Sequence, residues 1–466
     1  MLETLRRWRH TFLPLPVKYG RRFREVFELL RNHRNVSREQ LEAYQWQQLK
    51  ALLDYAYQHV PFYKQRFDSQ DIRPEDIRTK ADFRKLPILT KDDVIANRES
   101  LKSDEFVKFK PILTLTSGTT RDNTALYRSR DTEIWRSAVA WRYFFEIGYR
   151  FRDPRVRISI PLRHQSDLGK MPVDFNENAL MIESHLITPE FAPVIYERIR
   201  SFKPKLIYCQ PENLVQLIIY CREHDLEPFE VPLVLSVGEA LLPEFKTIIT
   251  EFMNSWVVDY YANRENVVAA GELGDGRMYT FGDYCYPEFL GKDGVPVQGK
   301  PGEIVSTSLV NYAFPLIRYN TDDIGIDRGY AADGLWPMPT MEMYGGRGKD
   351  LIVTRKGIVN PRPYSLFTGI GFVNFHQLQL EQLSLDEAVL RVVPSAAFDR
   401  ERELPGLEKS VREYFDNQLR IRVNLELVDE IPRTASGKFK FVISDLAMQY
   451  LRDNYVRGAG SEDNDR

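Results

Sequence analysis

Hydroxyl and glycine residues gather at Ser117, Gly118, Thr119 and Thr120, directly after an apolar stretch that is typical of a β-strand. Hydroxyl groups and open backbone N–H groups can bind phosphate oxygens, and a glycine allows those oxygens to approach closely. The stretch is not a Walker A loop, because it lacks the GxxxxGK pattern. The same residue types are common in ordinary turns, so the loop indicates phosphate binding only together with other motifs.

Two further stretches contain side chains suited to a planar base and a metal ion. Gly238 and Glu239 follow an apolar strand, and α/β sheets bind ligands at the carboxyl ends of their strands. Tyr261 lies at the end of another predicted strand and could stack on a base, while the carboxylate of Glu265 could ligate magnesium. A strand-to-helix turn, a core tyrosine and a solvated glutamate explain the same residues without any ligand.

Charged residues in the second half of the chain could complete such a site. Asp323 ends the stretch Tyr319–Asp323 and could accept hydrogen bonds from both ribose hydroxyls, although an Asx-type turn also fits. Arg347 provides a planar guanidinium for ribose or phosphate. Lys438 lies in a glycine-containing loop, where a mobile ammonium group could offset charge developing on a phosphate, although most lysines are simply solvated.

The elements that must position these motifs alternate between strands and helices. We predict strands at residues 112–116, 156–160, 206–208, 233–237 and 256–260, and helices at 131–149, 213–221 and 243–252. Strands separated by helices of this length favour βαβ units and a mostly parallel sheet. The N-terminal part is predicted to be helical, with one helix that ends at Pro61 and a short one capped by Thr90.

A change in composition after residue 280 indicates a second kind of structure. Glycine and proline become frequent, and the glycine cluster at 345–348 is typical of a flexible junction. We therefore expect an α/β chain with a large N-terminal domain over residues 1–345 and a small α+β lid over 346–450. Residues 451–466 are polar and are expected to be disordered.

Composition excludes several classes of function. The formal net charge is −2, so a nucleic acid is not an expected partner. Three scattered cysteines without a CxxC pattern argue against a disulfide framework and a thiolate zinc site. No apolar run reaches the ~18 residues needed to span a bilayer, and the basic N-terminal segment lacks the apolar stretch of a signal peptide. We expect a soluble cytoplasmic protein, with membrane-surface contact through the N-terminus as a lesser alternative.

The motifs occur together in the order found in a known superfamily. The sequence resembles the adenylate-forming superfamily of acyl-CoA synthetases, peptide-synthetase adenylation domains and luciferases. Within it, the chain is similar to the phenylacetate–CoA ligase branch through the stretches LKALLDYAYQHVPFYKQRF, KLPILTKDDV, LTSGTT, SVGEALLPE, YYANRE, YNTDDIG, GGRGKDLIV and PRTASGK. The resemblance extends over nearly the whole chain.

The resemblance implies that ATP and Mg²⁺ bind at the first group of motifs. Ser117–Thr120 would hold the ATP phosphates, and Glu265 would ligate Mg²⁺. Gly238 and Glu239 would line the adenine pocket, and Tyr261 would stack on the base. The family fold that is implied has a large AMP-binding domain followed by a small C-terminal lid.

The resemblance also implies a two-step reaction with a moving lid. Asp323 would hold the ribose hydroxyls with Arg347 nearby, Lys349 would lie at the hinge, and Lys438 would reach from the lid into the adenylation site. In the first step a carboxylic acid attacks ATP, which gives an acyl-adenylate and pyrophosphate. In the second step the thiol of CoA takes the acyl group, so ATP, Mg²⁺ and CoA are the implied cofactors and substrates.

Four positions depart from the family pattern and leave two alternatives open. Arg121, Ala262, Arg264 and Asp322 replace residues that are usually glycine or threonine. One alternative is an adenylate-forming transferase whose acceptor is a carrier protein, or a sugar or amine in surface-polysaccharide assembly. The other is a degenerate member that binds nucleotide or acyl ligand without turnover, although Glu265, Asp323 and Lys438 are retained.

Overall fold

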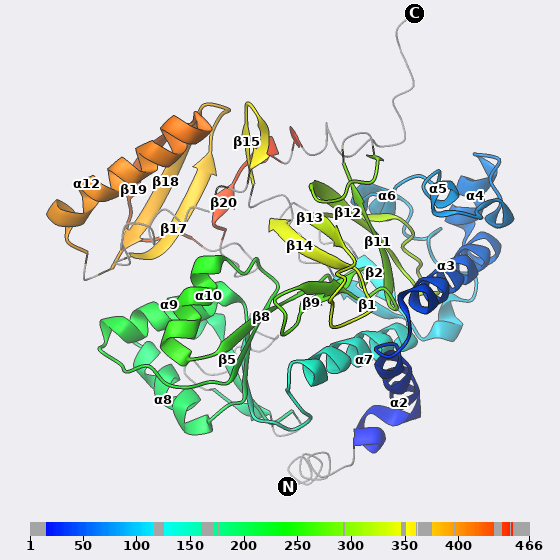
Figure 1. Ribbon diagram of the computed structural model, residues 1–466, viewed down its shortest axis with the longest axis horizontal. Helices are drawn as coiled ribbons and strands as arrows, with labels where there is room; N and C mark the ends of the chain where they lie inside the picture. The colour runs from blue at the N-terminus through cyan, green and yellow to red at the C-terminus, as the bar shows by residue number, and fades with distance from the viewer. Residues whose placement is uncertain are drawn as a thin grey trace, which may run out of the picture. The chain divides into compact units, whose positions relative to one another are not determined.

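The computed structural model describes residues 15–115, 125–159, 171–174, 177–291, 294–345, 351–359, 361, 375–395, 398–432, 440–447 and 449–450. The chain divides into two compact units (Figure 1). Unit 1 comprises the described parts of residues 149–259 and 344–453, and unit 2 comprises those of residues 13–148 and 260–343.

Unit 1 contains a sheet with parallel pairing at its centre. Its strands follow the order β8-β7-β6-β3-β5-β4. Their bounds are β3 Arg155–Ser159, β4 Val173–Asp174, β5 Ala179–Glu183, β6 Leu206–Cys209, β7 Leu233–Val237 and β8 Trp256–Ala262. Strand β3 pairs in parallel with β5 and β6, and β6 pairs in parallel with β7, whereas the short edge strand β4 is antiparallel to β5.

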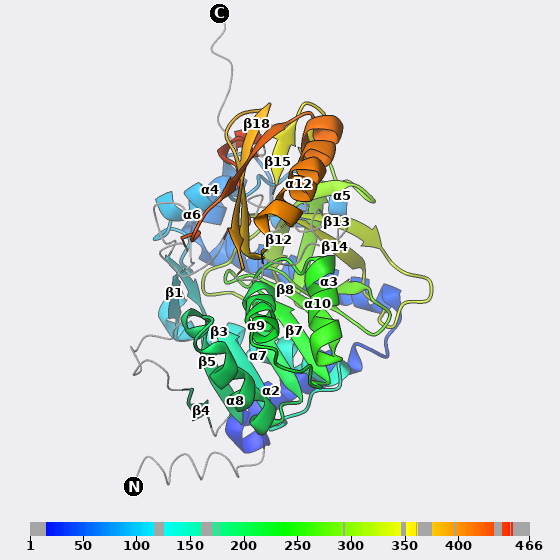
Figure 2. The ribbon, with the colours of Figure 1, turned by 90° about the vertical axis from the view of Figure 1, so that its left-hand side faces the viewer.

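Three helices pack against this sheet: α8 Ala192–Phe202, α9 Pro211–Glu223 and α10 Pro243–Met253. Figure 2 shows them beside one another, and their apolar side chains share one buried cluster with those of the strands. Helices α9 and α10 both begin at a proline, a residue favoured at the first helical position because the missing N–H is not needed there. The βαβ pattern predicted for this region is therefore confirmed.

The C-terminal part of unit 1 is a small α+β module. Its sheet has the order β19-β18-β17-β20, and a helix lies over it. The bounds are β17 Phe375–Gln382, β18 Glu387–Pro394, β19 Arg422–Leu427, β20 Val442–Ile443 and α12 Arg400–Val411, with a π-helical continuation over Arg412–Leu419 and a hairpin of β15 Ile352–Thr354 and β16 Gly357–Val359. Phe441 packs against Phe245 of α10, with ring centroids 5.6 Å apart.

The strand pairs of unit 2 are antiparallel, whereas most strand pairs of unit 1 described above are parallel. The order is β11-β12-β13-β14-β10-β9-β8, and the pairings β8–β9, β9–β10, β10–β14, β11–β12 and β12–β13 are antiparallel. The bounds are β9 Ala269–Glu272, β10 Met278–Thr280, β11 Cys285–Leu290, β12 Pro301–Ser308, β13 Tyr319–Gly329 and β14 Thr340–Gly345. The expected α/β fold is thus confirmed, with its parallel pairing concentrated in unit 1.

The helices of unit 2 precede this sheet in the chain. Their bounds are α2 Leu15–Asn32, α3 Arg38–His59, α4 Pro61–Asp68, α5 Lys80–Phe83, α6 Lys91–Ala96 and α7 Arg130–Glu146. Helix α3 ends just before Pro61, which becomes the first residue of α4. Thr90 caps α6 by accepting a hydrogen bond from the backbone N–H of Asp93, as predicted.

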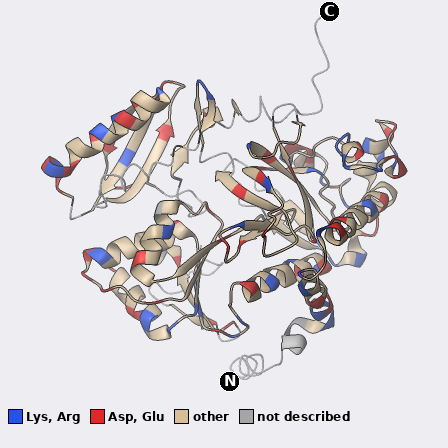
Figure 3. Ribbon diagram, in the orientation of Figure 1, with Lys and Arg blue, Asp and Glu red and all other residues tan. Residues whose placement is uncertain are grey.

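Acidic and basic residues alternate along several helices, including α2 (Figure 3).

Helix α7 buries an arginine together with its apolar residues. Ala138 and Trp141 are buried, and Arg142 is only 2% exposed. The Arg142 guanidinium forms an ion pair with the buried carboxylate of Asp283, which also lies 3.1 Å from Nδ1 of His33. The ion pair compensates two buried charges, each of which would be costly to bury without the other.

Among the described residues, no helix has the length and apolar character required to cross a membrane.

Candidate functional site

The carboxyl ends of β6 and β7 in unit 1 carry one predicted motif. The two strands pair in parallel, with Cys209 opposite Ser236, so the residues that follow them emerge at the same edge of the sheet. Gln210 Nε2 donates a 3.0 Å hydrogen bond to Oε1 of Glu239. Glu239 is therefore held beside the end of the neighbouring strand and is not a solvated surface residue.

Gly238 has a backbone conformation that explains its residue type. Its φ is +78°, in the left-handed region that side chains with a Cβ rarely adopt. A Cβ at this position would meet only Gln210 Cγ, at 4.0 Å, so conformation and not lack of space requires the glycine. The exposed backbone at this turn can lie close to a flat ligand.

Unit 2 brings together two residues that the sequence places on separate motifs. The hydroxyl of Tyr261, at the end of β8, donates a 2.7 Å hydrogen bond to Oδ2 of Asp323 on β13. Burial, and then the Asp323 carboxylate, raise the pKa of Tyr261, so its hydroxyl stays protonated and acts as the donor. Asp323 is only 4% exposed. The pair presents an oriented carboxylate next to a partly exposed aromatic ring.

Backbone and side-chain bonds hold the turn that carries Asp323. The backbone N–H of Asp323 donates to Oγ1 of Thr321, whose own hydroxyl donates to the carbonyl of Ile304 on β12. Asn320 Oδ1 accepts from the backbone N–H of Asp322, which has a left-handed φ of 61°. Because aspartate tolerates this region better than most residues, Asp322 can replace the glycine usual at this position of the family pattern.

A buried carboxyl lies behind this turn. Glu303 of β12 is 2% exposed and accepts a 3.3 Å hydrogen bond from Asn320 Nδ2. Burial raises the pKa of Glu303 to about 8, and the nearby charge of Asp322 adds to the rise. A largely protonated Glu303 therefore supports the segment that presents Asp323. No motif in the sequence pointed to this residue.

Glu265 lies in the turn between β8 and β9 and is half-buried. The turn is fixed by Asn263, whose Oδ1 accepts a 3.1 Å hydrogen bond from the backbone N–H of Val267. Glu265 follows Tyr261 by four residues, so both lie near the end of β8. Within the described residues, no three acidic, histidine or cysteine side chains gather into a group that could hold a metal ion without ligands from a substrate.

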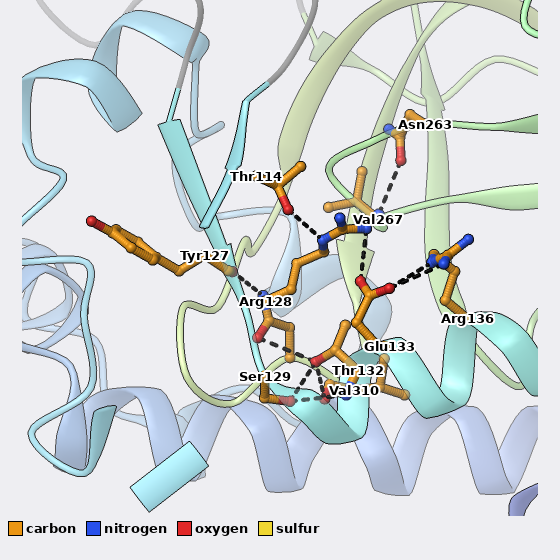
Figure 4. Close-up of polar contacts among 11 residues, drawn as sticks. Thr114, Tyr127, Arg128, Ser129, Thr132, Glu133, Arg136, Asn263, Val267 and Val310 are labelled. Carbon is orange, nitrogen blue, oxygen red and sulfur yellow. Dashed lines mark hydrogen bonds and ion pairs between the residues drawn. The ribbon is translucent and has the colours of Figure 1, made fainter. Parts of the chain in front are cut away.

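The hairpin of β1 (Ile112–Leu115) and β2 (Ala125–Arg128) brackets the predicted phosphate loop in the chain. Ser129 then caps α7 by accepting a 2.9 Å hydrogen bond from the backbone N–H of Thr132. Figure 4 shows Arg128 of this hairpin pointing at Glu133 of α7, which also meets Arg136. The pair Glu133 and Arg136 has the i,i+3 spacing of a helical ion pair, a signal present in the sequence.

The other predicted site residues lie outside the described residues. They are Ser117, Gly118, Thr119, Thr120, Arg347, Lys349 and Lys438. Their roles therefore remain predictions from the sequence. The structure shows the surroundings of the remaining candidates. Among them, Tyr261 and Asp323 are hydrogen-bonded to each other.

The chain is similar in sequence to known CoA ligases. Phenylacetate–coenzyme A ligase of Escherichia coli (strain K12) is 28% identical over 337 residues, which cover 69% of this chain and 74% of the relative. The enzyme of the same name from Thermus thermophilus is 25% identical over 441 residues, covering 88% of this chain and 97% of the relative. Residues 351–445 match the family model of the CapK C-terminal domain.

Solved structures show the same fold. A 2-hydroxyisobutyryl-CoA ligase in the postadenylation state, in complex with R3-HIB-AMP, superposes with a TM-score of 0.70 at 20% identity, covering 90% of this chain and 92% of that one. The chain is related to the phenylacetate–coenzyme A ligases and has the fold of adenylate-forming CoA ligases. The ligase in complex with 2-HIB-AMP and CoA gives a TM-score of 0.57 at 22% identity, covering 91% and 93%. The resemblance expected from the motifs is therefore confirmed.

Proposed function

We propose that the protein is an ATP-dependent ligase that joins a carboxylic acid to CoA and releases AMP and pyrophosphate. The observation that carries this proposal is the bond between Tyr261 and Asp323, which orients a buried carboxylate beside an aromatic ring. Such a pair suits the ribose and base of a nucleotide. The relationship to phenylacetate–coenzyme A ligases supports the reaction class.

In the first step, a carboxylate oxygen of the substrate acid attacks the α-phosphorus of ATP, and pyrophosphate leaves. Asp323 would accept hydrogen bonds from the ribose hydroxyls. Tyr261 would hold the Asp323 carboxylate in place, and its ring would stack on the base. Gly238, with its exposed left-handed backbone, and Glu239 would line the adenine pocket. Ser117–Thr120 would bind the phosphate oxygens through hydroxyl and backbone donors.

Mg²⁺ fits the donor set of this chain. Magnesium is commonly held by one or two carboxylates together with substrate phosphates, so a single protein carboxylate such as Glu265 suffices. The ion would offset negative charge on the phosphates. Lys438 would act as a second cation, which touches the substrate carboxylate or α-phosphate during adenylation.

In the second step, the sulfur of CoA attacks the acyl carbon and AMP leaves. We propose that residues 346–450 form a lid that rotates about a hinge at Lys349 between the two steps. The family match over residues 351–445 supports a separate module in this part of the chain. The chain's own thiols are poor acceptors. All three cysteines are buried, and burial raises the pKa of Cys221 and of Cys285 to about 12.

We further propose that the enzyme works in the cytoplasm, where ATP and CoA are both available. Its partners would be small molecules: a carboxylic acid, ATP and CoA. The near-neutral balance of charges agrees with this choice of partners.

The decisive experiment is pyrophosphate release from Mg·ATP across a panel of carboxylic acids, with and without CoA. A CoA ligase should release pyrophosphate with its acid and form a thioester only when CoA is present. Adenylation followed by transfer to another acceptor would instead identify an adenylate-forming transferase. If ATP binds but no acid in a broad panel releases pyrophosphate, a non-catalytic binding protein becomes the better description.

A further inference from the structure

An arginine on the parallel sheet of unit 1 has no role in the reaction steps above. Arg157 lies on β3, and its neighbours in register are Met181 on β5 and Tyr208 on β6. Val156 and Ile158, on either side of it, pack into the apolar cluster shared with α8, α9 and α10, so Arg157 lies on the opposite face of the sheet. Its guanidinium carbon lies 5.8 Å from the centroid of the Tyr208 ring, within the range of a cation–π contact. Strand pairing therefore holds these two side chains beside each other.

The charge of Arg157 is not neutralised within the part of the chain that the structure describes. No described acidic residue forms an ion pair with it, and its buried Nε has no hydrogen-bond acceptor there. Glu183 of β5 lies on the same face, opposite Ser159, but forms no ion pair with Arg157. By contrast, Nη2 of Arg155 on the same strand lies 3.1 Å from Oε2 of Glu177. Because a partly buried charge without a partner is unfavourable, an anion bound at Arg157 would be stabilising.

The strand order places Arg157 and Tyr208 where α/β sheets bind ligands. From β3 the chain continues to β4 and β5 on one side, whereas from β6 it continues through α9 to β7 on the other side (Figure 2). The carboxyl ends of β3 and β6 therefore form a topological switch point, the usual place for a ligand in an open α/β sheet. Arg157 lies two residues before the end of β3, and Tyr208 is the last residue but one of β6. Both side chains are partly exposed, so a ligand can reach them.

The same edge of the sheet carries the residues proposed to line the adenine pocket. Gly238 and Glu239 follow β7, which pairs in parallel with β6. Neighbouring strands lie about 4.8 Å apart, so β3 is about 10 Å from β7 across β6. A ligand that extends from the adenine pocket across β6 would therefore meet Arg157. In the proposed function the ATP phosphates are assigned to Ser117–Thr120 and Mg²⁺, which leaves the substrate acid as the anion for Arg157.

We propose that Arg157 and Tyr208 form a carboxylate-binding site that receives the substrate acid at the carboxyl ends of β3 and β6. The guanidinium would donate paired hydrogen bonds to the carboxylate, while the Tyr208 ring packs against the guanidinium. Two carboxylates could occupy the site: the one that is to be activated, or a second acidic group of a dicarboxylic acid. The identity of this ligand rests on the proposed ligase function, whereas the capacity of Arg157 to bind an anion does not.

The test compares wild-type protein with Arg157→Gln and Arg157→Lys. Glutamine removes the charge, whereas lysine keeps the charge but loses the paired donors. The matched control is Arg155→Gln, which removes an arginine from the same strand and face whose charge is already paired with Glu177. Calorimetry, with and without AMP, measures the binding of butyrate, succinate and phenylacetate, of their neutral amides, and of inorganic phosphate. Denaturant unfolding of each variant measures its stability.

At least one carboxylate should bind the wild-type protein about 10-fold or more tightly than its amide, and Arg157→Gln should remove this difference. Arg157→Lys should weaken the binding of that carboxylate by about 3-fold or more, whereas Arg155→Gln should leave it unchanged. Stability should show the opposite order, because Arg155→Gln breaks an ion pair and Arg157→Gln removes an unpaired charge. Weaker binding of all three carboxylates by Arg157→Gln would identify the reacting carboxylate as the ligand. An effect confined to succinate would identify the second acidic group.

Three results would overturn the proposal. Carboxylates and amides that bind the wild-type protein equally would exclude a carboxylate site. Loss of phosphate binding alone in Arg157→Gln would assign this arginine to a phosphate. A less stable Arg157→Gln with unaltered carboxylate binding would leave Arg157 with only a packing role against Tyr208. If Arg157→Gln does not fold, Arg157→Lys decides the question, because unchanged carboxylate binding by this variant would reject the paired donors.

These outcomes are separable from failure of the ligase function. Calorimetry with AMP involves no turnover, so the carboxylate site can be detected in a protein that activates no acid. Pyrophosphate release from Mg·ATP with the same acids tests the ligase function. Release with a KM for the acid that Arg157→Gln does not change would leave the ligase function intact and reject the carboxylate site.

Discussion

Tyr261 and Asp323 are 62 residues apart in the chain, yet the tyrosine hydroxyl donates a 2.7 Å hydrogen bond to the aspartate Oδ2. Tyr261→Phe keeps the ring but removes the donor that orients this carboxylate. A hydrogen bond to a charged group contributes about 1.5–3 kcal/mol, so the Kd for ATP should rise roughly 10- to 100-fold. Calorimetric titration with Mg·ATP measures the change. An unaltered Kd would show that Asp323 does not need this bond for nucleotide binding.

The buried carboxyl of Glu303 should make stability depend on pH. Its pKa is raised to about 8 in the folded protein and returns to an ordinary value on unfolding, so the folded state binds the proton more tightly. The resulting stability is fully present below about pH 4.5 and is lost as the pH rises through about 8. Relative to Glu303→Gln, the wild-type free energy of unfolding should fall by roughly 2–5 kcal/mol across this range.

Urea unfolding of both proteins at a series of pH values measures this difference. The glutamine variant resembles the protonated carboxyl and serves as the reference for all other titrating groups. A difference between the two proteins that stays constant with pH would contradict a raised pKa for Glu303.

Because residue 322 has a left-handed backbone conformation, the stability of the protein should depend on which small residue occupies this position. Asp322→Ala and Asp322→Gly both remove the carboxylate, but only glycine adopts a φ of 61° without strain. The alanine variant should therefore be less stable than the glycine variant by about 1–2 kcal/mol. Denaturant unfolding of the two variants measures this value. Equal stabilities would mean that the turn rearranges when the aspartate is removed.

Lys438 should affect the adenylation step more than the binding of ATP. A cation that meets charge developing in the transition state typically contributes about 10²–10³-fold in rate. Lys438→Ala should lower pyrophosphate release by this factor, with little change in the Kd for ATP. Thioester formation from a chemically supplied acyl-adenylate should survive. Near-normal pyrophosphate release would show that Lys438 is a solvated lysine.

Local patterns in the sequence were sufficient for most elements of the fold. Strand β7 lies where the apolar run 233–237 predicted it, and Thr90 caps its helix because the capping signal involves only nearby residues. The face of α7 was less predictable, since Arg142 becomes buried only by pairing with Asp283 from a distant segment. Hydrophobic periodicity and turn residues therefore predicted the positions of helices and strands better than they predicted which side chains are buried.

The sequence by itself determined the motif order, the residue types and hence the superfamily, because each motif is a short contiguous stretch and the order of the whole set is visible along the chain. Only the tertiary structure decided which of these residues meet. Sheet pairing and helix packing bring together the segments that form the Tyr261–Asp323 bond, bury Glu303 so that it retains its proton, and pair Arg128 with Glu133. Burial and long-range charge depend on such contacts, and no local spacing in the chain encodes them.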